Sequence, residues 1–203
     1  MNWPRGTALV PLCLGALSLW LPWVAHPAAA LVLTGLDMPE FVRFMGSAGA
    51  PLVTPCRIAF AGPLVSAALV ASLAVGPSDR SLWFRGLVLA GSIWLVSVAF
   101  SPLERRTEFL VGSLVVASIW AGAMLARPGP RLVEVVALAA GAAAPGLAVI
   151  QFLRTAPALG ALYGRAITWG VGSYLAAATS LVAAVWLGVT LVKRPAAAAR
   201  QRM

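Results

Sequence analysis

One segment near the C-terminus, residues 166–192, reads AITWGVGSYLAAATSLVAAVWLGVTLV and contains no charged side chain. The hydrocarbon core of a bilayer is about 30 Å thick, and a helix needs about 20 apolar residues to cross it. Lys193 and Arg194 end the run, as basic residues do where a helix leaves a membrane on its cytoplasmic side. We therefore predict a membrane-spanning helix over 166–192.

Comparable apolar runs occupy most of the remaining chain. Of its 203 residues, 61% are hydrophobic and only 10% are charged, whereas about a quarter of a soluble domain is charged. The predicted fold is an all-α, polytopic transmembrane helical bundle of about six spans, with residues 1–203 forming a single integral membrane domain. The five other predicted spans are about 7–24, 56–76, 84–100, 107–125 and 132–152.

The longest connection follows the first predicted span. Within it, Asp37 can cap a short helix, and Glu40 stands three residues later, as in a capping box. Apolar residues at helical spacing, with Arg43 opposite, indicate an amphipathic helix over about 38–45. This helix is too short to span a bilayer, so we predict that it lies in the interface of the first outer loop.

The charge of the chain is strongly positive, +9 at pH 7. The basic residues are scattered singly or in pairs between apolar runs, without the basic surface and stacking aromatics that bind nucleic acid, so we expect no nucleic-acid partner. With the N-terminus inside, nine of the 15 basic residues fall on the cytoplasmic side. The positive-inside bias then predicts a multi-pass protein of the plasma (bacterial inner) membrane, with N- and C-termini cytoplasmic.

Small residues recur at every fourth position of the last predicted span. Such a stripe lets two helix backbones approach closely, and this packing drives helix association in lipid. The sequence leaves open whether the partner helix belongs to this chain or to another subunit. The predicted packing stripe consists of Gly172, Ala176, Ser180, Ala184 and Gly188.

Charged residues gather in the predicted outer connections. They can dock a partner's extramembrane domain or bind a charged solute, or they can form a solvated rim of ion pairs, each contributing at most about 1 kcal/mol. The rim is the favoured interpretation, because none of these residues falls at the centre of a span. We call this set the outer charged cluster: Asp37, Glu40, Arg43, Arg57, Glu104, Arg105, Arg106 and Glu108.

The predicted spans contain no ionisable residue near their centres; Glu134, in the first turn of the fifth span, comes nearest. A proton-coupled pump or an intramembrane aspartyl protease needs such groups. Pro63 and the triplet Ala144-Pro145-Gly146 are expected to kink or interrupt their helices. Broken helices mark substrate sites in some transporters, but a kink that neighbouring helices accommodate by packing is the favoured interpretation. Cys13 and Cys56 form no CxxC pair and are expected to be separate thiols.

These residues assign no catalytic group, no metal site and no cofactor. The leading hypothesis is a non-catalytic accessory, scaffold or assembly subunit of a larger membrane complex, with the lipid bilayer and other membrane protein subunits as partners. The alternative is a small-solute permease or the membrane component of a transport system, motivated by the interrupted helices. A third hypothesis is a membrane enzyme that uses the outer-face carboxylates.

Overall fold

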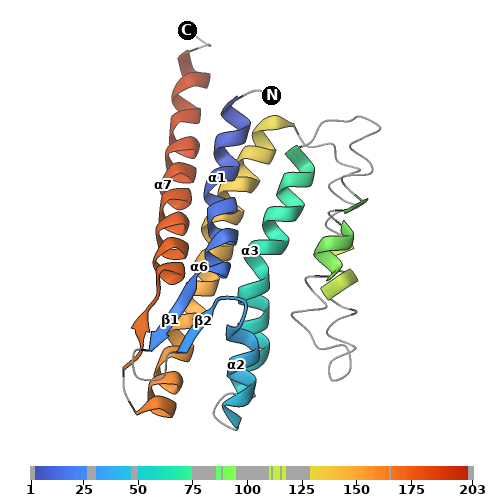
Figure 1. Cartoon of the computed structure of the whole chain (residues 1–203). Helices are drawn as coiled ribbons and strands as arrows, with labels where there is room; N and C mark the ends of the chain where they lie inside the picture. The colour runs from blue at the N-terminus through green and yellow to red at the C-terminus, as the bar shows by residue number, and fades with distance from the viewer. Residues whose placement is uncertain are drawn as a thin grey trace.

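The computed structural model describes residues 3–26, 31–46, 50–74, 86–87, 89–94, 110, 112–114, 116–117, 129–164 and 166–200. These residues are mostly α-helical, and three of their helices are long and apolar enough to cross a membrane. Four helices lie side by side as a bundle (Figure 1): α1 (Trp3–Leu17), α3 (Val53–Ala74), α6 (Pro130–Tyr163) and α7 (Val171–Arg200). The apolar part of α1, with the 3-10 turn that follows it, covers Thr7–Trp20 and is shorter than the other three.

The path of the chain defines two ends of this bundle. Both termini lie at one end, which we call the terminal end (Figure 1). The end of α3 and the start of α6 lie at the same end, so the chain between them leaves and re-enters the described structure on one side. The opposite end holds a small β-sheet and helix α2 (Met38–Phe44), and we call it the sheet end.

The sheet is a feature that the all-α prediction did not include. Strand β1 (Pro22–His26) pairs antiparallel with β2 (Leu31–Thr34), and the register matches Val24 with Leu33. Strand β3 (Thr168–Trp169) pairs with the other edge of β1, so the strand order is β2-β1-β3. Helix α1 therefore ends at Leu17, before the end of the predicted span 7–24, and α7 begins at Val171, after the start of the predicted span 166–192.

Gly170 makes the third strand possible. Its backbone N–H donates a hydrogen bond of 2.8 Å to the Trp23 carbonyl oxygen. A Cβ at this position would overlap the carbonyl of Pro22, so only glycine lets the start of α7 lie this close to β1. The hydroxyl of Thr168 also donates to the Ala25 carbonyl oxygen. These contacts join two chain segments that are more than 140 residues apart.

Helix α2 occupies the range for which a short helix was predicted, and its position in a membrane interface stays a prediction. The predicted capping box is wrong. Asp37 precedes the helix, but its carboxylate accepts hydrogen bonds from the backbone N–H of Thr34 at 3.0 Å and from the Thr34 hydroxyl at 2.7 Å. Asp37 therefore stabilises the turn after β2, and Glu40 is left to bind other groups.

Helix α6 runs unbroken through Pro145 and Pro157 for 34 residues, so the predicted interruption at Ala144-Pro145-Gly146 is absent. The neighbouring helices fill the site instead. A Cβ at Gly15 of α1 would overlap the Pro145 ring, which shows how closely the two helices pack there. On the α7 side, the Ser180 hydroxyl donates a 2.6 Å hydrogen bond to the Ala142 carbonyl oxygen. Helix α3 likewise continues through Pro63.

The predicted spans 84–100 and 107–125 lie largely outside the described residues. The described parts of both are helical, over 89–94 and 112–114 among others. Leu89, Ile93 and Val116 pack with Leu69 of α3 and its neighbours in one apolar cluster. Segments from both ranges thus contact the same helix.

Candidate functional site

Aromatic side chains form the centre of the sheet end. Trp23 of β1 is fully buried, and its ring centroid lies 4.8 Å from that of Phe60 and 5.6 Å from that of Phe152. Its indole N–H donates a 2.9 Å hydrogen bond to the Ser18 carbonyl oxygen. Trp169 of β3 contacts Phe152 in turn, at 5.5 Å. One tryptophan thereby joins the sheet to α3, to α6 and to the 3-10 turn that follows α1.

Arg57 is a charged side chain enclosed in this end of the bundle. Only 1% of it is exposed, and it lies in the second turn of α3 between the buried residues Cys56 and Phe60. Its Nη2 donates a 3.0 Å hydrogen bond to Oε1 of Glu40 on α2. Because a buried cation is costly without a counter-charge, this pair holds α2 against α3. The predicted ion pair of Arg57 with an outer carboxylate is present, but its predicted solvation is wrong, because the Arg57 side chain is buried.

Three buried side-chain donors of α3 and α6 have no hydrogen-bond partner among the described residues. They are Nε and Nη1 of Arg57 and Nε2 of Gln151 on α6. By contrast, the buried hydroxyls of Ser18, Ser173 and Thr155 each donate to a backbone carbonyl of the same chain segment, three or four residues earlier. The sheet end therefore contains polar hydrogen-bonding capacity that the described contacts leave unused.

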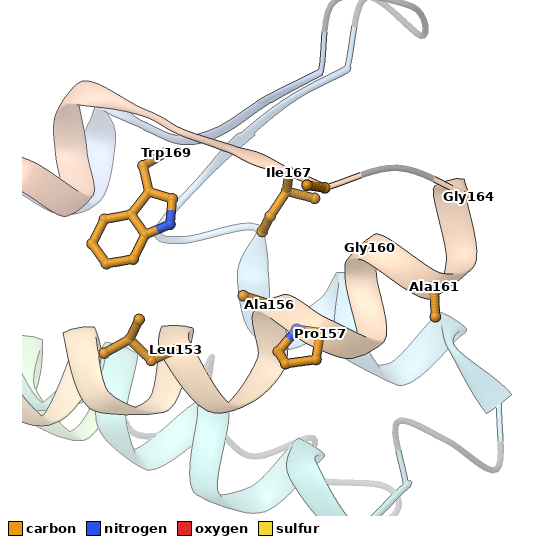
Figure 2. A pocket seen from close by; sticks show the side chains of 9 residues that line it. Leu153, Ala156, Pro157, Gly160, Ala161, Gly164, Ile167 and Trp169 are labelled. Carbon is orange, nitrogen blue, oxygen red and sulfur yellow. The ribbon is translucent and has the colours of Figure 1, made fainter.

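A shallow apolar groove runs along the last three turns of α6 and under β3 (Figure 2). Its volume is about 600 Å³. Trp169 lies across the groove from Leu153, and Ile167 faces the helix from the connecting segment. We call it the α6–β3 groove; it is lined by Leu153, Ala156, Pro157, Gly160, Ala161, Gly164, Ala166, Ile167 and Trp169.

The structure brings together only part of the outer charged cluster. Glu40 contacts both Arg57 and Arg43; the second ion pair has an N–O distance of 3.7 Å and exposed side chains. Asp37 is engaged in the turn with Thr34. Glu104, Arg105, Arg106 and Glu108 lie outside the described residues. Docking of a partner or a solute on this cluster stays a prediction.

The packing stripe of α7 divides into two parts. Ala176 is fully buried, and a Cβ at Gly172 would lie 2.6 Å from the Ser18 carbonyl oxygen. With Ser180, these residues face α1 and α6. Ala184 is exposed, and a Cβ at Gly188 would meet no described atom within 4 Å. Successive fourth positions advance by about 40° around a helix of 3.6 residues per turn, so the stripe leaves the contact face.

A sequence pattern that indicates the groove was not used in the prediction. Ala156, Gly160 and Gly164 form another row of small residues at every fourth position, continued beside it by Pro157 and Ala161. The predicted fifth span ended at residue 152, so this row was not assigned to a helix. No comparable signal identified Trp23 or Gln151 as buried, because their contacts join segments that are distant in the sequence.

Both cysteines are free thiols, with Cys13 exposed and Cys56 buried. Within the described part of the chain, His, Cys, Asp and Glu side chains form no group of three that could hold a metal ion. Comparison of the chain with protein-family models, curated proteins and solved structures finds no match.

Proposed function

We propose that this chain is a six-span protein of the plasma (bacterial inner) membrane, with both termini cytoplasmic, that serves as a non-catalytic accessory, scaffold or assembly subunit of a larger membrane complex. Three helices with the length and apolarity of spans support the membrane part of this proposal. We include α1 as a fourth span because it lies beside the other three helices (Figure 1). Its apolar part, Thr7–Trp20, is about 21 Å long at 1.5 Å per residue, so the residues before it and β1 after it would complete the crossing of about 30 Å.

Two further spans between α3 and α6 account for the path of the chain. The end of α3 and the start of α6 lie at the same end of the bundle, so the segment between them crosses the membrane an even number of times (Figure 1). Leu89 and Val116, from the two predicted spans, pack on α3 in one apolar cluster. An even total also agrees with both termini lying at the terminal end.

The observation that carries the subunit proposal is the half of the α7 packing stripe that no described residue covers. Only 17% of the apolar window of α7 is buried within the chain, compared with 39% for α3 and for α6. Ala184 and Gly188 lie on this uncovered part, and small residues are the ones that let a second helix approach closely. A helix of a membrane partner would pack against Ala184 and Gly188.

We rank a small-solute permease second. Its main support was an interrupted fifth helix, and that helix continues through Pro145 with its neighbours packed against the proline. An enzyme using outer carboxylates ranks third. Asp37 accepts hydrogen bonds from Thr34 and Glu40 pairs with Arg57, so both carboxylates have structural roles, while Glu104 and Glu108 lie outside the described residues.

Co-purification from native membranes tests the proposal. Gly188→Leu, which places a large side chain on the uncovered stripe, should abolish recovery of a stoichiometric membrane partner that the wild-type chain retains. Ala178→Leu is the matched control, because Ala178 is an exposed small residue on a different face of α7. A monodisperse, monomeric protein that recovers no partner would contradict the proposal, as would equal recovery with the Gly188 variant.

A further inference from the structure

The α6–β3 groove lies at the depth where α6 leaves the hydrocarbon core. Helix α6 has 34 residues and is therefore about 51 Å long, well beyond the roughly 30 Å of a hydrocarbon core. Counting about 20 residues from Leu132 places the boundary near Phe152. The groove begins at Leu153 and extends away from the terminal end. Its apolar lining thus continues the lipid-facing surface into the headgroup region.

Among the described residues, Arg154 is a cation beside the groove at this depth. Arg154 is exposed and immediately follows Leu153. It precedes Pro157 by three residues and Ala161 by seven, so helical spacing places it along the rim of the groove. No ion pair of Arg154 with a carboxylate occurs within the described residues. Its side chain is exposed, so the structure leaves it open on the described side to an anion approaching from the bilayer.

The wall opposite α6 has the chemistry of a membrane interface. Trp169 is 36% exposed and lies across the groove from Leu153 (Figure 2). Tryptophan favours the headgroup level, since its ring is apolar while its indole N–H donates a hydrogen bond. The groove volume of about 600 Å³ falls within the range of roughly 300–1,000 Å³ that is typical of small-ligand sites.

We propose that the α6–β3 groove binds an anionic phospholipid, with one acyl chain along the small residues of α6 and the phosphate held by the guanidinium of Arg154. Ala156 and Gly160 leave room for the chain, and the rim cation supplies preference for an anionic headgroup. A guanidinium recognises a phosphate through paired, charge-assisted hydrogen bonds. This lipid site does not depend on a protein partner at α7.

Native mass spectrometry of the purified full-length protein in detergent tests the site, with phosphatidylglycerol and phosphatidylcholine of identical acyl chains as probes. The wild-type protein should retain one phosphatidylglycerol in preference to phosphatidylcholine. Arg154→Gln should weaken phosphatidylglycerol binding about fivefold and leave phosphatidylcholine binding unchanged, since one basic residue near a headgroup contributes about that factor. Ala156→Leu, which fills the groove, should weaken the binding of both lipids.

Matched controls lie on the same helix away from the groove. Arg131→Gln removes an exposed cation at the terminal end, and Ala143→Leu enlarges an exposed small residue; both should bind lipid as the wild type does. Arg154→Lys keeps the charge and should retain the preference, which separates loss of binding from misfolding. Equal retention of the two lipids by the wild type would overturn the proposal. Unchanged phosphatidylglycerol binding by Arg154→Gln would also overturn the proposal. The same holds if Ala156→Leu lost a bound protein partner and kept its lipid.

Discussion

The hydroxyl of Ser180 on α7 donates a hydrogen bond of 2.6 Å to the carbonyl oxygen of Ala142 on α6. This carbonyl lies within one turn before Pro145, where the missing N–H of the proline weakens the backbone hydrogen bonding of the helix. Gly146 leaves space for the contact, because a Cβ there would lie 2.8 Å from the Ser180 hydroxyl oxygen. The carbonyl that Pro145 leaves without its N–H donor is that of Gly141, so the Ser180 bond to Ala142 does not replace the lost bond but links α7 to α6 one residue further along.

Ser180→Ala should therefore destabilise the protein by about 1 kcal/mol, the usual size of an interhelical hydrogen bond in a membrane protein. Unfolding in mixed micelles of mild and denaturing detergent measures the change. Thr190→Ala is the control, because the Thr190 hydroxyl donates to Trp186 of its own helix and joins no second helix. Equal losses in the two variants would mean that the Ser180 bond adds nothing to helix association.

The Glu40–Arg57 pair should respond asymmetrically to substitution. Glu40→Gln leaves the buried guanidinium without a counter-charge and should destabilise the protein by about 1–2 kcal/mol, a value reduced for the half-exposed carboxylate. Arg57→Met keeps most of the volume and leaves a carboxylate that water can solvate, so its cost should be smaller. The same detergent unfolding measures both.

Arg43→Gln provides the control for this pair. Its 3.7 Å contact with Glu40 is exposed, and its loss should change stability by less than about 0.5 kcal/mol. If Arg57→Met cost more than Glu40→Gln, the guanidinium would stabilise the fold mainly through groups other than Glu40, because methionine keeps the apolar stem, and the charge pair would be secondary.

The sequence predicted the helical segments better than the connections between them. Apolar runs longer than about 18 residues indicate helices almost independently of context, and α3, α6 and α7 follow such runs. The strands were missed because Pro22–His26 and Leu31–Thr34 carry no polar–apolar alternation. The third strand was missed because the pairing of β3 with β1 is set by contacts across most of the chain.

The sequence predicted which charged and small residues belong to the candidate site, but not how they pair or which of them are buried. Glu40 and Arg57 were both assigned to the outer charged cluster, but their pairing and the burial of Arg57 follow from α2 folding back on α3. The stripe on α7 was identified as a packing face, whereas its change of face after Ser180 follows from the helical repeat and the position of α6. A stripe of small residues thus predicts that another helix packs closely, but it does not predict which helix that is.

Gly170→Ala should separate β3 from β1. Its Cβ would overlap the Pro22 carbonyl, and since both contacting groups are backbone, neither can move without disturbing the sheet. We expect a loss of about 2–3 kcal/mol, as for overpacking in a core, together with a change in the near-ultraviolet circular dichroism of Trp23 and Trp169. Gly188→Ala, with open space around it, should instead gain about 0.5–1 kcal/mol. An unchanged tryptophan signal in Gly170→Ala would argue against the third strand.

Cysteine labelling should distinguish six spans from four and fix the orientation. In a background with Cys13→Ser and Cys56→Ala, Phe44→Cys at the exposed end of α2 should react with an impermeant maleimide in intact cells. Met203→Cys should react only after the cells are permeabilised, because the terminal end is expected to face the cytoplasm. Ser78→Cys, between the second and third predicted spans, should behave like Met203→Cys. Thr107→Cys, between the third and fourth, should behave like Phe44→Cys if two spans connect α3 to α6. Labelling of Thr107→Cys only after permeabilisation would reduce the bundle to four spans, and reversal of all four patterns would invert it.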